Sequence, residues 1–360
     1  MGEISLARGI PAPECLPVEE LADCARVAIE RDGRTILSYG SPSGYGPLRE
    51  WLAERHGVDP GRVVVTNGSL QGFVFLASHY AGRGRVLVEA PTYDRPLRIL
   101  ADAGADVLAV DQDEEGLDLD ALEAALAPGD ALLYTIPTFQ NPSGRTLSVE
   151  RRLRLAGLAR ERGLVLFEDD PYGLVRFEGT SAPSLFELME GEGVIYSSSF
   201  SKTVAPGVRV GYYVLPEDLA AAVEVMATST YITPALLSQA AVDEFLRRGA
   251  FEPNLERVRG LLRVRRDAML EALERELSGR ASWSRPEGGY FLWLELGVET
   301  GPLLERAREA GVSFVRGADF FLPGAGGERS ARLAFSYASP EEIAEAVGRI
   351  AAFVPAGAAV

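Results

Sequence analysis

Short apolar runs that alternate with helical stretches constrain the fold of this chain more than any other feature of its sequence. The runs are apolar at nearly every position, which is typical of strands buried on both faces. They cover residues 62–66, 85–91, 106–110, 131–137, 164–170 and 194–200. Helical patterns separate several of them, among others at residues 69–80, 118–128 and 148–163. The alternation predicts an α/β fold with a mostly parallel sheet covered by helices.

The pattern of apolar and charged residues changes after about residue 240. A long amphipathic pattern rich in Arg and Glu leads to apolar strands and then to a helix that begins near Pro340. The segments are a helix at 254–277 and strands at 288–296, 312–317 and 332–337. We predict a large mostly parallel domain at 40–240 and a smaller α+β domain made of 1–39 and 241–360.

Composition excludes several classes of function. The net charge of −16 argues against a nucleic-acid or anionic-membrane partner, because both require basic patches. No signal sequence or long apolar run is present, so we expect a cytoplasmic protein and reduced thiols at Cys15 and Cys24. His56 and His79 lie far in sequence from any Cys or carboxylate cluster, so we expect no metal site.

Lys202 is the single lysine of a chain that has 36 Lys and Arg residues in total. Arg supplies the same charge for ion pairs and solubility. Only Lys can become a neutral amine and attack a carbonyl carbon to form a Schiff base. The lone lysine therefore indicates covalent chemistry, although a composition biased towards Arg also retains a lysine by chance.

Candidate site residues follow the predicted strands, where ligands bind in open α/β sheets. Gly68 and Ser69 place backbone N–H groups at the start of a helix, which suits a phosphate or serves only as a turn. Tyr93 either stacks on a flat ring or packs on the next helix. Asn141, in "TIPTFQNPSG", either donates a hydrogen bond to a ligand oxygen or completes a turn.

Carboxylates end a further apolar run. In "LVLFEDDPYG", Glu168, Asp169 and Asp170 precede Tyr172. A carboxylate at such a position is costly unless it is paired, and a protonated heteroaromatic nitrogen is one suitable partner.

The lysine segment "SSSFSKTVAPGVRVGY" adds the hydroxyls of Ser199 and Ser201 and the guanidinium of Arg209, which together suit a dianionic phosphate. A Schiff-base lysine, a phosphate site, a stacking ring and a carboxylate for a pyridinium are the requirements of pyridoxal phosphate.

The sequence also resembles the class I/II aminotransferases of fold type I, in the branch of 2-aminoadipate and kynurenine aminotransferases. The motifs that carry the resemblance are, in order, "GIPAPE", "YGSPSGYGPLRE", "NGSLQG", "EAPTYD", "FQNPSG", "EDDPYG", "SFSKTVAPGVRVGY" and "RLAFSY", spanning residues 9–337. Each is weak alone, but eight in the family's order are specific. The resemblance implies a fold type I domain pair that binds pyridoxal phosphate and works as a homodimer with shared active sites.

The resemblance also implies a role for each candidate residue. Lys202 forms the Schiff base, Asp169 pairs with the pyridine nitrogen and Tyr93 stacks on the ring. Asn141 and Tyr172 bind the phenolic oxygen. The phosphate residues are Gly68, Ser69, Leu70, Ser199, Ser201 and Arg209, with Tyr39 reaching the phosphate of the neighbouring subunit. Arg332 binds the substrate α-carboxylate, assisted by the backbone of Gly9.

The sequence departs from the family pattern near the substrate. Leu70 replaces a usual Gln, and Arg8 stands beside Gly9. Relatives that recognise 2-aminoadipate have a longer segment before this point, so that specificity does not carry over. Arg8 either points to solvent or meets a distal carboxylate of the substrate.

The resemblance implies transfer of an amino group between an L-amino acid and a 2-oxo acid, with glutamate and 2-oxoglutarate as one pair. A lyase or decarboxylase would use the same cofactor residues and stays an alternative. A non-catalytic sensing module is a further alternative, disfavoured because the chain is acidic and has no room for a winged helix.

Overall fold

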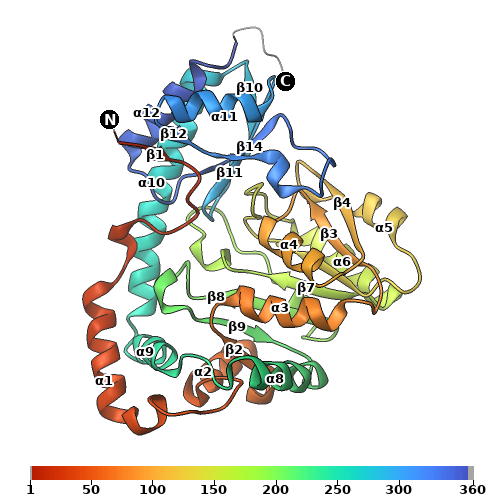
Figure 1. Cartoon of the computed structure of the whole chain (residues 1–360), viewed down its shortest axis with the longest axis vertical. Coiled ribbons are helices and arrows are strands. Elements are labelled where there is room, and N and C mark those ends of the chain that lie inside the picture. Colours follow the sequence, from red (N-terminus) through yellow and green to blue (C-terminus); the bar gives the residue numbers. More distant parts are fainter. Residues whose placement is uncertain (1, 356–360) are drawn as a thin grey trace.

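An eight-stranded sheet forms the centre of the protein in this computed structural model, which describes residues 2–355 (Figure 1). Its strand order is β2-β9-β8-β7-β6-β3-β4-β5, and β9 and β5 run opposite to the other strands. The strands are β2 (Val63–Thr66), β3 (Val86–Ala90), β4 (Val107–Asp113), β5 (Gly116–Leu117), β6 (Leu132–Thr135), β7 (Val165–Asp169), β8 (Val194–Ser199) and β9 (Gly211–Val214). The mostly parallel sheet predicted from the apolar runs is confirmed.

Helices cover both faces of this sheet. Those of the large sheet region are α2 (Gly46–His56), α3 (Ser69–Tyr80), α4 (Asp94–Asp102), α5 (Leu119–Ala125), α6 (Val149–Arg162), α7 (Leu185–Leu188) and α8 (Glu217–Tyr231). Successive residues of a strand point to opposite faces. Accordingly, Phe167 of β7 joins the apolar core with α3, α4 and α8, whereas Leu166 joins the core with α6 and α7. This alternation decides which carboxylate of "FEDD" faces which side.

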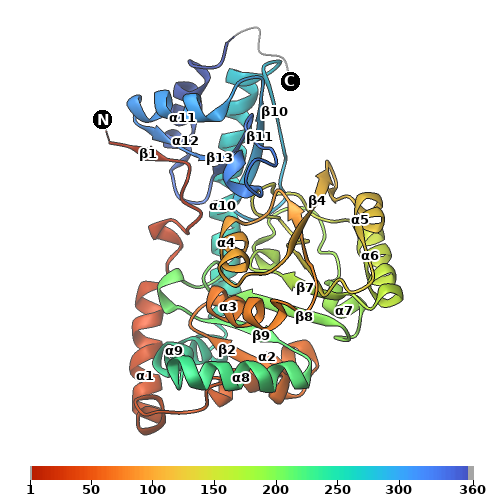
Figure 2. The same ribbon diagram turned by 45° about the vertical axis from the view of Figure 1, so that its right-hand side comes forward.

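A second, antiparallel sheet has the order β10-β11-β14-β13 and lies above the first sheet in Figure 2. Its strands are β10 (Ala281–Trp283), β11 (Phe291–Leu296), β13 (Val315–Arg316) and β14 (Ser330–Ala334). The helices of this part are α10 (Phe251–Leu277), α11 (Thr300–Glu309) and α12 (Pro340–Ala351). The predicted strand at 312–317 is divided, because β12 (Val312–Ser313) pairs with β1 (Ile4–Ser5) in a separate ribbon while β13 pairs with β14.

The N-terminal segment passes from the small sheet region down to the base of the molecule (Figure 1). After β1 it continues into α1 (Val18–Ile36), which packs against α9 (Leu236–Arg247). Short 3-10 helices cover Pro13–Cys15, Pro60–Arg62, Gly173–Val175, Pro206–Val208 and Gly317–Phe320. The division into domains at residues 40 and 240 stays a prediction.

Two further observations concern thiols and membranes. Cys15 and Cys24 are both free and buried, as expected. Among the helices of residues 2–355, none combines the length and apolar character needed to cross a bilayer.

Candidate active site

A cavity of about 230 Å³ lies at the carboxyl ends of β6, β7 and β8, beside the start of α3. The predicted site residues that line it are Ser69, Leu70, Tyr93, Asn141, Asp169, Tyr172, Ser199, Ser201, Lys202 and Arg209. These residues lie far apart in the sequence and meet because parallel strands end at one edge of the sheet. Ile10, Ile136, Pro171 and Pro206 also line the cavity and were not predicted.

Lys202 extends into this cavity from the turn that follows β8. Its Nζ donates a 2.7 Å hydrogen bond to the carbonyl oxygen of Gly9. The same nitrogen lies 5.2 Å from the ring centre of Tyr290 and 5.9 Å from that of Tyr172. Burial, reinforced by the charges of Arg332 and Arg209, lowers the pKa of Lys202 to about 8. A substantial fraction of this amine is therefore neutral and nucleophilic near physiological pH.

Asp169 is the last residue of β7 and lines the cavity. Its Oδ2 accepts a 2.8 Å hydrogen bond from the hydroxyl of Tyr134. Its Oδ1 is buried and has no hydrogen-bond partner among the described residues. Burial raises the pKa of Asp169 to about 6, although the Tyr134 hydrogen bond opposes the shift. A buried carboxylate oxygen without a partner is suited to a cationic or N–H ligand atom.

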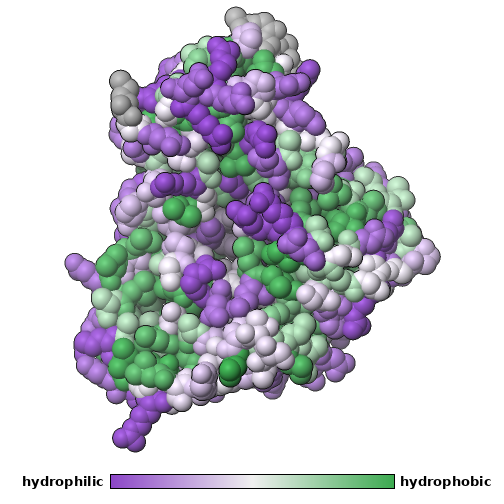
Figure 3. All heavy atoms as spheres, viewed as in Figure 1, coloured by the Kyte–Doolittle hydropathy of each residue, from purple (hydrophilic) through white to green (hydrophobic). Residues whose placement is uncertain are grey.

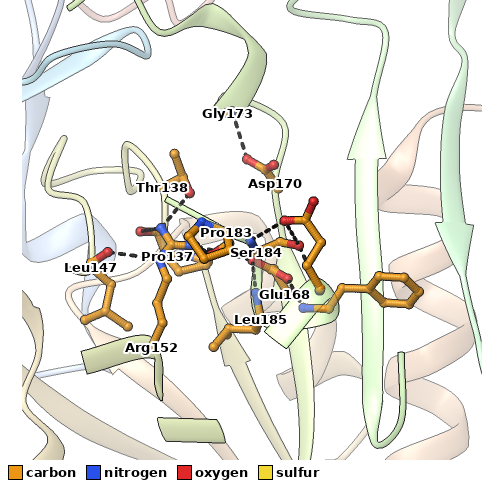
Figure 4. Close-up of polar contacts among 12 residues, drawn as sticks. Pro137, Thr138, Leu147, Arg152, Glu168, Asp170, Gly173, Pro183, Ser184 and Leu185 are labelled. Atoms are coloured by element: carbon orange, nitrogen blue, oxygen red, sulfur yellow. Dashed lines mark hydrogen bonds and ion pairs between the residues drawn. The ribbon is translucent and has the colours of Figure 1, made fainter. Parts of the chain in front are cut away.

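The two neighbouring carboxylates are used elsewhere, as Figure 4 shows. Glu168 accepts hydrogen bonds from the backbone N–H groups of Leu185 and Phe186. Nη1 of Arg152 lies 3.6 Å from Oε1 of Glu168. Asp170 accepts hydrogen bonds from the N–H of Gly173 and the hydroxyl of Tyr196. Both carboxylates therefore accept hydrogen bonds from the protein itself, whereas Oδ1 of Asp169 has no such bond within residues 2–355.

Arg152 completes the buried cluster of Figure 4. Its side chain is almost fully buried and donates to the carbonyls of Leu147 and Pro137 and to the hydroxyl of Thr138. These bonds join the loop after β6 to α6. The cluster therefore braces the loop that carries Asn141 from the side opposite to the cavity.

A cup of hydrogen-bond donors suited to an anion, called the anion cup below, lies at the start of α3. The first backbone N–H groups of a helix have no intrahelical acceptor. Gly68 precedes them with φ of +88°, and a Cβ there would lie 2.2 Å from Nη2 of Arg209. Arg209 donates to the carbonyls of Pro206 and Asn67, and among residues 2–355 it pairs with no carboxylate. The cup thus presents positive charge without an internal counterion.

Ser199 and Ser201 close the other side of this cup. The Ser199 hydroxyl lies 2.9 Å from that of Ser201, and the backbone N–H of Ser201 donates to Ser199 Oγ at 3.1 Å. Together with Arg209, these groups provide the hydroxyl and guanidinium donors that a phosphate requires.

Arg332, on β14, brings a second guanidinium that pairs with no carboxylate among residues 2–355. Its Nη1 donates to Oδ1 of Asn141 at 2.9 Å and its Nη2 to the carbonyl of Ala7 at 3.0 Å. Its Nε is buried and has no hydrogen-bond partner in the part of the chain that the structure describes. Its Cζ lies 4.1 Å from the ring centre of Phe291, so the charged plane is held between aromatic and polar contacts. Such an arginine is suited to a ligand carboxylate.

Five predicted residues are not part of the cavity lining: Gly68 and Arg332, described above, and Gly9, Tyr39 and Arg8. Gly9 reaches the site through its carbonyl, and a Cβ on it would lie 2.3 Å from the Phe291 ring, so only glycine fits there. Tyr39 is 77% exposed and lies away from this cavity. Arg8 is exposed, with its guanidinium 5.2 Å from the ring centre of Tyr337.

The sequence reasoning missed Tyr134. The signal was available, because the predicted strand alternates and Tyr134 faces the same side of the sheet as Ile136 and Asp169. Within an apolar run, however, a tyrosine is expected to be an ordinary core residue that only fills space.

The residues fit pyridoxal phosphate on features of the structure itself. The cavity combines an amine with a lowered pKa, a cup with an unpaired guanidinium, and a buried carboxylate oxygen without a partner. Each matches one functional group of that cofactor: its aldehyde, its phosphate and its ring nitrogen.

A solved structure has the same fold. The crystal structure of the alpha-aminoadipate aminotransferase of Thermus thermophilus, complexed with N-(5'-phosphopyridoxyl)-L-leucine, aligns with a TM-score of 0.92 at 39% identity. The alignment covers 98% of this chain and 92% of that chain. Fold and site thus define a pyridoxal-phosphate-dependent enzyme of fold type I.

Family membership follows from the sequence comparisons. The family model described as aminotransferase class I and II matches residues 5–350. A 2-aminoadipate transaminase of Thermus thermophilus is 42% identical over 357 residues, which cover 97% of this chain and 89% of the relative. An aromatic-amino-acid aminotransferase of Thermococcus litoralis is 34% identical over 97% of this chain and 87% of its own length. The chain belongs to the class I and II aminotransferases and moves an amino group between an L-amino acid and a 2-oxo acid.

Proposed function

We propose that Lys202 carries the cofactor covalently and that the surrounding cavity holds its other groups. The observation that carries the proposal is that Lys202, Asp169, Asn141 and Arg209 line one cavity. Asp169 would pair through its free Oδ1 with the ring nitrogen. Tyr93 would stack on the ring, and Asn141 and Tyr172 would bind the phenolic oxygen. The phosphate would be held by Gly68, Ser69, Leu70, Ser199, Ser201 and Arg209.

Bound pyridoxal phosphate supplies an electron sink for negative charge at the substrate α-carbon. The residues of this chain do the remaining work. Nζ of Lys202, once free, would take the proton from the substrate α-carbon and deliver it to the former aldehyde carbon of the cofactor, because its pKa of about 8 suits both acceptance and donation. Asp169 stabilises positive charge on the ring nitrogen. The phenyl ring of Phe291 covers the guanidinium of Arg332 and limits its contact with water.

Arg332 would bind the substrate α-carboxylate, with the backbone of Gly9 beside it. The proposal is supported by the unpaired Nε and by the hydrogen bond to Asn141, which fixes the guanidinium next to the cavity. With Oδ1 of Asn141 used in this way, its amide Nδ2 is left as the donor for the cofactor oxygen.

For the substrates, we propose glutamate and 2-oxoglutarate as one pair, with a second amino acid from the range that the relatives' names suggest. The test is a coupled assay of the purified holoenzyme with 2-oxoglutarate and a panel of acidic, aromatic and aliphatic amino acids. Glutamate formation with at least one of them is expected. If none reacts although cofactor is bound, the proposed pair is wrong and a lyase reaction becomes the better proposal.

The working unit would be a homodimer in the cytoplasm, with Tyr39 reaching the phosphate of the neighbouring subunit. Exposed apolar side chains support an interface near this residue, since Leu37 and Tyr39 follow α1 and Ile232 precedes α9. Figure 3 shows hydrophobic surface over α1 and α9 in the lower part of that face. Apolar patches of this kind mark association surfaces.

The lowered pKa of Lys202 gives a pH-dependent prediction for the cofactor-free enzyme. Below pH 8 the amine is mostly protonated and unreactive; above it the amine is mostly neutral. The rate at which a small amine-reactive reagent modifies Lys202 should therefore rise with pH and reach half of its maximum near pH 8. Mass spectrometry of the peptide that contains Lys202 measures the rate. A half-maximal rate only near pH 10.5, the ordinary lysine pKa, would contradict it.

Arg8 gives a second prediction. Because its guanidinium is exposed and lies on Tyr337 outside the cavity lining, Arg8→Ala should change kcat/KM by no more than about twofold, equally for acidic and apolar substrates. Steady-state kinetics with glutamate and leucine measure this. A selective loss of about tenfold or more for glutamate would instead identify Arg8 as the group that meets a distal carboxylate.

A further inference from the structure

Tyr134 is a buried tyrosine outside the cavity lining whose hydroxyl donates a hydrogen bond to Asp169, a residue of that lining. We propose that Tyr134 is a positioning residue: its hydroxyl fixes Oδ2 of Asp169, directs Oδ1 towards the cofactor ring nitrogen and keeps the proton on that nitrogen. This inference rests on the proposed pairing of Asp169 with the ring nitrogen.

The backbone places the two residues in reach of each other. Tyr134 of β6 is paired in register with Phe167 of β7, so Asp169 lies two residues further along on the same face. The hydroxyl of Tyr134 then lies 2.8 Å from Oδ2 of Asp169. The other carboxylate oxygen has no partner among the described residues.

The ring of Tyr134 has little freedom to move. It is fully buried, and its centre lies 5.2 Å from the rings of both Phe73 and Phe167 in near-perpendicular contacts. Phe73 belongs to α3, whose first residues form the anion cup. The donor is therefore held in one position by the same core that supports the phosphate end of the site.

The direction of this hydrogen bond matters for the chemistry. Burial raises the pKa of Tyr134 well above its ordinary value, so the hydroxyl stays protonated and can only donate to the carboxylate. A donor of this kind favours the ionised form of Asp169 and opposes transfer of the proton from the ring nitrogen to Oδ1. Without it, burial would favour the protonated carboxyl and a neutral ring nitrogen more strongly.

Other titratable groups face this pair but do not replace the bond. They are Glu89 on β3, Tyr93 before α4, Asp170 after β7 and Tyr213 on β9. Of these groups, Asp170 disfavours ionisation of Asp169 by repulsion. Asp170 itself is bonded to Gly173 and Tyr196. Two hydroxyls act in the opposite direction and lower the pKa of Asp169: that of Tyr134 and, to a smaller extent, that of Ser197 on β8.

The test is Tyr134→Phe, which keeps the ring in the aromatic cluster and removes the hydroxyl. The holoenzyme is prepared with cofactor labelled with nitrogen-15 at the ring nitrogen. Near neutral pH, the nitrogen resonance of the variant should move from the position of a protonated ring towards that of a neutral ring. The kcat should fall by about tenfold, the effect of one buried hydrogen bond to a charged group, while the KM for the amino acid changes by less than about twofold.

Tyr196→Phe is the matched control. Tyr196 is also buried and donates to an aspartate, Asp170, at 3.1 Å, but that carboxylate does not line the cavity. This variant should keep the wild-type resonance and kcat. If Tyr134→Phe also keeps both, or if Tyr196→Phe changes both equally, the tyrosine is only a packing residue and the proposal is overturned.

Asp169→Asn distinguishes the failure of this inference from the failure of the proposed pairing between Asp169 and the ring nitrogen. If Asp169→Asn leaves the nitrogen resonance unchanged, the pairing of Asp169 with the ring fails and the role of Tyr134 fails with it. If Asp169→Asn shifts the resonance but Tyr134→Phe does not, the pairing stands and only the positioning role of Tyr134 is wrong. A shift in both variants supports both.

Discussion

Lys202→Ala is expected to lower kcat by more than about 10⁴-fold, because one substitution removes the covalent attachment of the cofactor and the group that moves the α-proton. Lys202→Arg should fail equally, since a guanidinium stays protonated and cannot attack a carbonyl. The fold should survive in both variants, because within residues 2–355 the side chain makes a single hydrogen bond, to the carbonyl of Gly9. Single-turnover kinetics and far-UV circular dichroism measure the two effects.

A small primary amine in solution provides the control for this prediction. It should restore part of the rate to Lys202→Ala, where the deleted side chain leaves space, and none to Lys202→Arg, where the guanidinium fills that space. Sustained turnover by the arginine variant at a rate near that of the wild type would show that Lys202 is not the reactive amine.

Asp169→Asn should lower kcat by about 10²- to 10³-fold, the usual cost of removing one preorganised electrostatic partner. The amide keeps the shape of the side chain but cannot balance a positive charge on the ring nitrogen. Asp170→Asn is the matched control, because Asp170 follows directly in the chain but is bonded to Gly173 and Tyr196 away from the cavity. It should reduce thermal stability while changing kcat far less.

The contrast between these two variants assigns the catalytic carboxylate. If Asp170→Asn were the more damaging change for kcat and Asp169→Asn kept most of the activity, Asp170 would be the partner of the ring. Glu168 would be the next choice, but its carboxylate is already bonded to the backbone N–H groups of Leu185 and Phe186.

Much of the fold was predictable because fully apolar strands leave a strong pattern. The predicted runs around Val88, Leu133, Phe167 and Ile195 are strands of the central sheet. The short antiparallel strand β9 was not predicted, because its residues directly follow the polar lysine segment and read as its continuation. The division of residues 312–317 was also missed, since it depends on pairing with Ile4 and Ser5 at the other end of the chain.

The site was predictable where side chains carry the chemistry and lie at strand ends. Lys202, Asp169 and Asn141 were found in this way, and they line one cavity. Backbone groups of the site were harder to predict, because every residue has a carbonyl. Nothing in the sequence therefore marks the Ala7 carbonyl as the one that accepts a hydrogen bond from Arg332. Tyr134 was missed for a different reason: in a buried strand, a tyrosine that fills space and one that donates a hydrogen bond look alike.

The contacts of Arg332 also have a consequence for how the chain folds. Its hydrogen bonds reach Asn141, 191 residues earlier, and Ala7, 325 residues earlier. Contacts of such sequence separation close last, because the entropy of the intervening loops must be lost first. The central sheet could assemble on the ribosome well before the carboxylate-binding end of the site exists. Binding of a substrate-like carboxylate should therefore be detectable only after the whole chain has folded. The formation of helices and strands should be detectable at earlier stages of folding.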